Sequence, residues 1–218
     1  MAKDAKDLLE RVRAELKRDG VTNRLVPLIA SGEAPRAALR ALAAEEHRIV
    51  QSDWRAFLTL AAQAPVPAQR EFFAMVAGGE GLALAKLADF ASATGLTPDD
   101  VATYRSLPGC QAYPSYVARL ALAGNPHDAL LAILANFAEW GGYCAAIAAG
   151  LREHYGFDDA GCAFFDFFAE PAPELDALGL RALTDVLATG WTPDAALPAA
   201  HLLHSYELMF WNTLADLP

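Results

Sequence analysis

The sequence lacks long apolar stretches and a leader-like beginning. No window comes near the roughly 18 uninterrupted apolar residues that a membrane-spanning helix needs. The first residues, Met1 to Asp7, alternate charged and small side chains, unlike the apolar core of a signal peptide or the pattern of a transit peptide. We therefore expect a protein that does not associate with a membrane and is not exported.

Basic residues and cysteines are also scarce. The chain has 17 Lys and Arg against 27 Asp and Glu, a formal net charge of −10. This balance argues against nucleic-acid binding, because non-specific affinity for nucleic acid comes from neutralising phosphates. The cysteines, Cys110, Cys144 and Cys162, show no CxxC spacing, so neither a disulfide framework nor structural zinc is expected. A reduced, cytoplasmic location fits this pattern best.

What the sequence does contain is helix-forming and apolar. Apolar residues make up 54% of 218 residues, enough for a substantial core in a single domain over residues 1–218. Ala and Leu dominate and β-branched residues are few, which predicts an all-α fold. Residues Leu107 to Gly109 are predicted to form a loop. Periodicity, N-terminal prolines and C-terminal glycines predict these approximate helices: 3–18, 25–30, 35–64, 68–94, a short one from 97, 112–123, 126–155, 158–168, 173–189 and 192–214.

The last predicted helix carries the most informative polar residues. His201, His204, Glu207 and Trp211 recur at three- and four-residue spacing and therefore share one helical face. Leu, Met and Phe occupy most positions between them, which indicates a helix that is apolar nearly all round and deeply buried. A buried carboxylate needs partners. Glu207 thus serves either an internal polar network or a ligand.

Polar residues on two other helical stretches extend this pattern. Glu45 and Glu46 are adjacent acids, typical of a solvated face, although one of them must lie nearer the core. Tyr113 and Tyr116, three residues apart, are typical of core tyrosines whose hydroxyls reach the rim.

Glu139 and Trp140 precede a pair of glycines, Gly141 and Gly142, inside a predicted helix. Each glycine costs roughly 1 kcal/mol relative to alanine in such a place. A closely packed helix or a ligand is the natural reason to keep this pair.

Three stretches resemble the TenA family, which comprises thiaminase II and its relatives. Tyr206-Glu207-x-x-Phe210-Trp211 looks like the C-terminal Y-E-x-x-F-W signature of that family, and it is the specific motif. Ala112-Tyr113-Pro-Ser-Tyr116 resembles the segment a-Y-t-x-y/f, and the stretch from Glu46 to Ala64-Pro65 resembles the segment that relatives begin with Gln-Asp and end with Ala-Pro. The resemblance implies a haem-oxygenase-like helical bundle that binds no haem, needs no cofactor or metal, and forms a homo-oligomer (a dimer or tetramer).

The resemblance also implies site residues. Glu46, Tyr113 and Glu207 match the acid, tyrosine and C-terminal glutamate of the family's catalytic pocket. The family's cysteine nucleophile normally lies in a P-C-x-W stretch, and this chain has Ala138 there when the tryptophans are matched, or Asn136 when the distance from Tyr113 is matched. Cys144 is either a substitute facing the pocket or a buried apolar residue. Further residues expected around the ligand are Tyr116, Asn136, Glu139, Trp140, Cys144, His204, Tyr206 and Trp211.

Three functions remain open at this point. The first is a TenA-like protein without the usual cysteine that binds a small heteroaromatic ligand, such as a thiamin-related aminopyrimidine, and hydrolyses it through Glu207. The second is a non-haem iron oxidase, since Glu46, His47, His201, His204 and Glu207 supply suitable ligand types. Against it, Phe164 to Phe168 contains no histidine where such relatives have H-x-x-x-D-x-x-H. The third is a binding protein without catalysis.

Overall fold

A computed structural model describes residues 4–218, with Asp19 described by its backbone alone, and confirms the all-α prediction. The part of the chain it describes contains no strand. The helices are α1 (Ala5–Leu16), α2 (Leu25–Ala30), α3 (Arg36–Gln63), α4 (Pro67–Ala93), α5 (Pro98–Thr103), α6 (Pro108–Ala123), α7 (Pro126–Tyr155), α8 (Asp159–Ala169), α9 (Pro173–Ala188) and α10 (Ala196–Ala215), with short 3₁₀ turns at Lys17–Asp19 and Pro193–Ala195.

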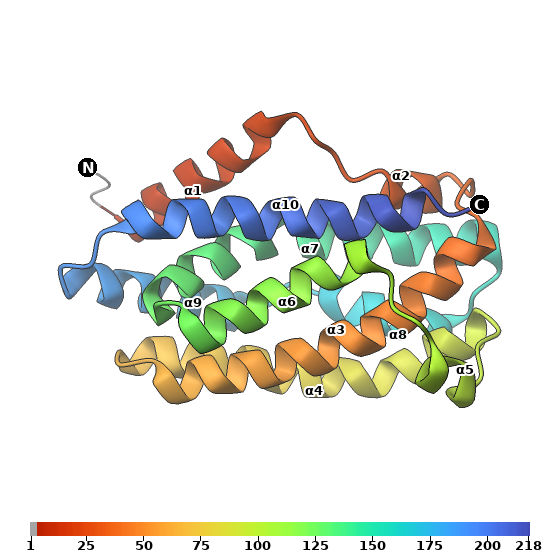
Figure 1. Cartoon of the computed structure of the whole chain (residues 1–218), viewed down its shortest axis with the longest axis horizontal. Coiled ribbons are helices and arrows are strands. Elements are labelled where there is room, and N and C mark those ends of the chain that lie inside the picture. The colour runs from red at the N-terminus through yellow and green to blue at the C-terminus, as the bar shows by residue number, and fades with distance from the viewer. Residues whose placement is uncertain (1–3) are drawn as a thin grey trace.

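The long helices run along the length of the molecule and form one bundle. Helices α3 and α4 pack against each other, and α10 packs on α6 and α7. Figure 1 shows α10 extending between α1 and α2 on one side and α6 on the other, with the described chain ending at the opposite end from α1's first turn. Helices α3, α4, α6, α7 and α10 therefore make up the body of the bundle.

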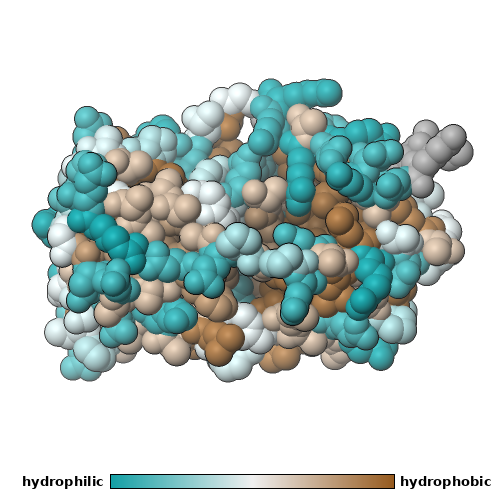
Figure 2. All heavy atoms as spheres, turned by 180° about the vertical axis from the view of Figure 1, so that it is seen from behind, coloured by the Kyte–Doolittle hydropathy of each residue, from teal (hydrophilic) through white to brown (hydrophobic). Residues whose placement is uncertain are grey.

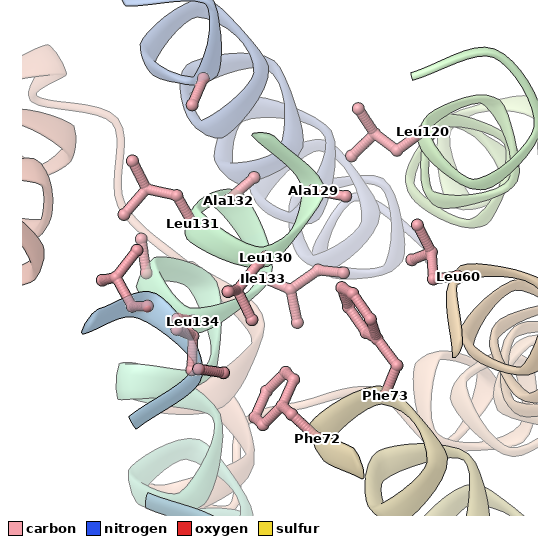
Figure 3. Packing of buried hydrophobic residues seen from close by; sticks show 14 of the residues in the cluster. Leu60, Phe72, Phe73, Leu120, Ala129, Leu130, Leu131, Ala132, Ile133 and Leu134 are labelled. Carbon is pink, nitrogen blue, oxygen red and sulfur yellow. The ribbon is translucent and has the colours of Figure 1, made fainter. Parts of the chain in front are cut away.

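The hydrophobic core of this bundle is divided into two clusters. The first cluster contains the second half of α3 from Ala56, the first half of α4 to Ala77 and the first part of α7 to Ala135. Figure 3 shows part of it, with Phe72 and Phe73 of α4 facing side chains of α7. The second cluster contains the first half of α3 to Val50, α4 from Ala83 and α7 from Cys144. The division falls in the middle of each of these helices.

The same division is present in α10. Leu203 belongs to the first cluster and Phe210 to the second, and Glu207 lies between them. On α3 and α4 the intervening residues include Asp53 and Glu80, and on α7 Asn136, all of them buried. Burying a polar group without a partner is unfavourable, so this layer between two apolar clusters is where a functional site is expected.

The predicted helix bounds agree with the structure except in a few places. Helix α6 begins at Pro108, not near Ala112, because proline at a first helical position has a favourable φ and needs no N–H partner. The predicted loop at Leu107–Gly109 is therefore wrong beyond Leu107. The start of the first predicted helix, Lys3, lies outside the described residues. The prediction that α10 is deeply buried on nearly all sides is wrong on one side, because its Leu202 and Met209 side chains are 44% and 46% exposed.

Helix α7 occupies a central position that accounts for its apolar composition. It is the one described helix that is long and apolar enough to suit a membrane span, and half of its most apolar stretch is buried inside the fold. It contacts α1, α2, α8, α9 and α10. Gly150 lets α2 approach closely, because a Cβ at that position would lie 2.5 Å from the backbone oxygen of Ile29.

Candidate active site

A cavity of about 780 Å³ lies in the polar layer between the two clusters. This volume is within the range of pockets that hold small molecules and cofactors. Its inner wall combines aromatic rings with four buried acids. The acids are Glu46, Asp53, Glu80 and Glu207, and the aromatic residues are Phe72, Tyr113, Phe137, Trp140, Phe164, Phe167, Phe168, Phe210 and Trp211.

Glu207 is held in place by its neighbours on both sides. Asn136 Nδ2 donates a hydrogen bond to Glu207 Oε2 at 2.6 Å, and Trp211 Nε1 donates to Oε1 at 3.4 Å. Burial raises the pKa of Glu207 to about 7, while the hydrogen bonds from Trp211 and Asn136 lower it. A carboxyl that is oriented and half-protonated near neutral pH is suited to give and accept a proton.

The other three acids lie on α3 and α4 and influence one another. Burial raises the pKa of Glu46 to about 8, and the charges of Asp53, Glu45 and Glu207 add to the increase. Burial also raises the pKa of Asp53 to about 8, against a hydrogen bond from Tyr113 that lowers it. The pKa of Glu80 is well above its usual range because of burial and then of the charges of Asp53 and Glu46. Near neutral pH these acids therefore retain protons that solvent-exposed carboxyls would have lost.

Aromatic rings form a continuous wall beside the acids. Trp140 packs on Trp211 with ring centroids 5.8 Å apart and a tilt of 36°, and it meets Phe168 edge-on at 5.5 Å. Phe168 in turn contacts Phe164. Flat π surfaces next to carboxyl groups favour a flat ligand that carries N–H donors.

The mouth of the cavity is formed by different elements. Lys6, Glu10 and Arg13 come from α1, and the segment from Ala169 to Ala172 joins α8 to α9. Figure 2 shows the face opposite to that of Figure 1, where apolar side chains are recessed among polar ones. The charged residues of α1 thus border the way in, and the deeper acids are shielded from water.

The structure brings together six of the residues predicted from the sequence. The residues that line the cavity as predicted are Glu46, Tyr113, Asn136, Trp140, Glu207 and Trp211. The ambiguity between the adjacent acids is also resolved. Both are buried, so a solvated pair is wrong. Glu45 accepts hydrogen bonds from the Leu107 N–H at 2.6 Å and Gln111 Nε2 at 2.8 Å, whereas Glu46 faces the cavity.

Five predicted ligand-binding residues do not line the cavity: Tyr116, Glu139, Cys144, His204 and Tyr206. Tyr116 and Tyr206 are half-buried and pack against each other with centroids 5.3 Å apart. Glu139 accepts a hydrogen bond from Tyr143 and pairs with Lys17 at 2.9 Å, and His204 acts electrostatically on Glu139.

Cys144 is fully buried, and burial raises its pKa well above the usual range, so it supplies no thiolate to the cavity. It belongs to the second apolar cluster. Of the adjacent glycines, Gly141 lines the cavity and lies close to the backbone oxygen of Phe168, where a Cβ would be 3.2 Å away, as expected for a close-packed position. Gly142 has open space around it.

Asp53 and Glu80 were not identified from the sequence. Asp53 follows Glu46 by about two helical turns and therefore shares its face. Glu80 lies between Gly79 and Gly81 in an otherwise apolar stretch of α4. The signal in the sequence that could have identified these two residues is an acidic side chain near the middle of a long, largely apolar helix.

The histidines invoked for an iron centre lie elsewhere. His47 lines a separate cavity with residues of α4 and α5, and His201 lies 3.5 Å from Glu15 of α1. None of His47, His201 and His204 lines the cavity that holds the acids. Between residues 4 and 218 no three His, Cys, Asp or Glu side chains are grouped so as to hold a metal ion. The geometry of this donor set therefore gives the iron-oxidase hypothesis no support.

Fold and site together define a haem-oxygenase-like helical bundle with an acidic and aromatic cavity. The chain belongs to the TENA/THI-4/PQQC family, whose sequence model matches residues 21–187. The matched region includes α3, α4, α6 and α7 but ends before α10, which contributes Glu207 and Trp211. No curated protein sequence matches the chain significantly.

Solved structures with the same fold cover nearly the whole chain. A TenA family transcription regulator from Silicibacter sp. TM1040 is 18% identical, with a TM-score of 0.76 over 98% of this chain and 97% of that one. A TenA homologue from P. horikoshii OT3 is 17% identical, with a TM-score of 0.73 over 97% and 98%. A domain of unknown function with a heme oxygenase-like fold from Shewanella denitrificans OS217 is 14% identical, with a TM-score of 0.70 over 99% and 92%. These identities establish the fold alone.

Proposed function

We propose that the chain binds a thiamin-related aminopyrimidine in the acidic cavity and hydrolyses it with Glu207 as general acid and base. The observation that carries the proposal is the position of Glu207. It is 7% exposed, oriented by Asn136 and Trp211, and faces a cavity lined with aromatic rings. Membership of the TENA/THI-4/PQQC family supports a thiamin-related ligand.

Recognition of the ligand follows from the composition of the wall. An aminopyrimidine is flat and carries an exocyclic amino group, which donates N–H bonds to carboxylate oxygens. Glu46 is 2% exposed and lines the cavity, so it can accept such a bond away from competing water. The ring of Tyr113 and the tryptophans contribute the apolar contact that a heteroaromatic ring needs.

The proposed reaction replaces the amino group of an aminomethyl substituent by a hydroxyl. Protonated Glu207 gives its proton to the leaving amine as the carbon–nitrogen bond breaks. Water attacks the same carbon, and its proton passes to the Glu207 carboxylate, so the acid is regenerated and the products are the hydroxymethylpyrimidine and ammonia. Water is the nucleophile because Asn136 and Ala138 stand where the family's cysteine is expected, and Cys144 is not on the wall.

Glu207→Gln tests the chemical role directly. The substitution keeps the shape and one hydrogen-bonding oxygen but removes the proton donor, so turnover of aminomethylpyrimidine is lost while its affinity is largely kept. Asp89→Asn is the matched control, because Asp89 is an exposed acid of α4 outside the cavity wall. Saturable binding with hydrolysis at background in the unmodified protein would eliminate the enzymatic part.

Binding without catalysis is the second candidate, and one observation favours it. Neither residue that aligns with the family's cysteine, Asn136 or Ala138, is a nucleophile of the required kind. In that case ligand binding still raises the melting temperature, and neither aminomethylpyrimidine nor thiamin is converted. A thermal-shift titration followed by product analysis separates the two candidates.

A further inference from the structure

Asp53 and Glu80 have no role in the chemistry proposed above, although both face the cavity. Asp53 is 4% exposed and Glu80 is 9% exposed. Asp53 lines the cavity, and its Oδ1 is buried without a hydrogen-bond partner. A buried acceptor left unpaired is unfavourable by about 1–3 kcal/mol, so this oxygen is the strongest indication of a missing partner in the cavity.

The described part of the chain supplies no cation that neutralises these two acids. Within residues 4–218 neither Asp53 nor Glu80 forms an ion pair with a Lys, Arg or His side chain. The basic residues that line the cavity, Lys6 and Arg13, belong to α1 at its mouth. Lys6 lies 3.9 Å from Glu10, and Arg13 donates to the backbone oxygen of Leu134 at 2.8 Å. In the empty cavity protonation therefore keeps these two acids neutral, and a cationic ligand that enters the cavity can take the place of those protons.

We propose that Asp53 and Glu80 form a subsite for an amidinium edge, a planar cationic group with two neighbouring N–H donors. The inference rests on the proposed function and specifies the ligand further: the aminopyrimidine binds with its ring nitrogen protonated. Its ring N–H and amino N–H then point toward carboxyl groups from α3 and α4. Glu46, on the same face of α3 as Asp53, accepts the second N–H of the amino group.

A planar cation fits the surroundings better than a compact ammonium group. Delocalised cations are more weakly hydrated and stack on aromatic faces, whereas an ammonium group keeps a tightly held water shell. The subsite opens into a cavity whose aromatic rings include Tyr113, Phe72 and Phe164. Parallel N–H donors also match carboxylate oxygens in pairs, which gives strong, directional hydrogen bonds.

Benzamidine and benzamide test the subsite as a matched pair of probes. They have nearly the same shape, and only benzamidine carries the cationic edge at pH 7.5. Isothermal titration calorimetry on the unmodified protein is expected to give at least about tenfold tighter binding of benzamidine, the effect of one or two hydrogen bonds between charged groups. Benzylamine, with a compact ammonium group, is expected to bind more weakly than benzamidine.

The double variant Asp53→Asn/Glu80→Gln is expected to reduce the preference for benzamidine to within about twofold. Asp89→Asn is the matched control: Asp89 is an exposed acid further along α4, and the substitution removes charge without touching the cavity. It is expected to leave the preference unchanged. The comparison of probes on the unmodified protein needs no variant, so equal affinities overturn the subsite even if the double variant does not fold. In that case the single variants Asp53→Asn and Glu80→Gln, each expected to reduce the preference, take its place.

The outcomes separate the subsite from the proposed function. Equal affinities for benzamidine and benzamide, or an undiminished preference in a folded double variant, overturn the subsite even if aminomethylpyrimidine binds. Tighter binding of benzylamine than of benzamidine overturns the inference that the subsite prefers a planar cation to a compact ammonium group. A clear benzamidine preference that the double variant abolishes supports the subsite, and if aminomethylpyrimidine then fails to bind, it is the proposed function that falls.

Discussion

Asn136 and Glu207 join the middle of α7 to the middle of α10 through a hydrogen bond of 2.6 Å from Nδ2 to Oε2. Both residues are buried, at 7% exposure each. Asn136 thus holds one oxygen of the carboxyl, and Trp211 Nε1 donates to the other at 3.4 Å. The pair fixes the acid that the proposed chemistry depends on.

Asn136→Leu removes the amide donor while keeping a similar volume. Because the hydrogen bond from Asn136 lowers the pKa of Glu207, we expect its loss to raise that pKa above its present value of about 7. An increase on the order of one unit corresponds to the net worth of such a bond. Carbon-13 NMR of the Glu207 carboxyl as a function of pH measures the change, and an unchanged or lower midpoint would show that the amide does not stabilise the ionised form.

Stability is expected to decrease as the pH rises from about 5 to about 8. Burial raises the pKa of Glu46 from 4.5 to about 8 and that of Glu207 to about 7, so in this range the folded protein binds protons that the unfolded chain has released. The free energy of unfolding then decreases with pH. Urea unfolding at several pH values measures the slope.

Glu46→Gln removes one of these titrations. At pH 8.5 the variant is expected to melt several degrees above the unmodified protein, since roughly 2–4 °C accompanies each kcal/mol in a chain of this size. Asp89→Asn, at an exposed position, should leave the slope with pH as it is. A Glu46→Gln variant with the original slope would contradict the assignment.

Glu45→Ala is expected to have the opposite effect on stability. Glu45 accepts hydrogen bonds from the Leu107 N–H and from Gln111, which anchors the first turn of α6. Removing it leaves two partly buried donors unpaired and destabilises the fold by about 1–3 kcal/mol. Denaturant unfolding is the measurement. Glu45→Gln, which keeps an acceptor, should recover part of the loss, and a neutral Glu45→Ala would show that the contact is dispensable.

Two glycines of α7 offer a matched test of packing. Gly150→Ala would place a Cβ 2.5 Å from the Ile29 backbone oxygen, so α2 must move and stability falls by about 1–3 kcal/mol. Gly142→Ala meets no atom within 4 Å and should stabilise the helix by up to about 1 kcal/mol. Thermal unfolding of both variants shows whether the signs differ, and the same sign for both would contradict the packing described for α2 and α7.

Most helices could be predicted because each carries an apolar periodicity between clear start and stop residues. Leu107–Gly109 could not be predicted correctly, since Leu-Pro-Gly suits both a loop and a helix start. The burial of Glu45 could not be inferred either, because its partners, the Leu107 N–H and Gln111, come from a distant part of the sequence. Long-range partners of this kind leave no local pattern.

Helical spacing placed only some of the expected site residues on the cavity wall. Glu207, Trp211, Tyr113 and Asn136 line the cavity as expected, but Tyr206 and His204 point elsewhere on the same helix. Helical spacing gives the shared face only to within a broad arc, and packing against α6 and α7 decides which part of that arc meets the cavity. To predict that Asp53 and Glu80 share the cavity would have required the register between α3 and α4, which only tertiary structure supplies.

The helices that line the cavity follow one another along the sequence in an order that affects how the cavity forms during synthesis. Helix α10 follows α1, α3, α4, α6 and α7 in the sequence, so on the ribosome Glu46, Asp53 and Glu80 emerge well before the helix that completes the cavity wall. Until α10 docks, water reaches these carboxyls, which stay ionised and repel one another. Docking excludes the water, and the nascent protein must then take up protons from the surrounding solution, so that closure of the cavity is expected to slow in alkaline conditions.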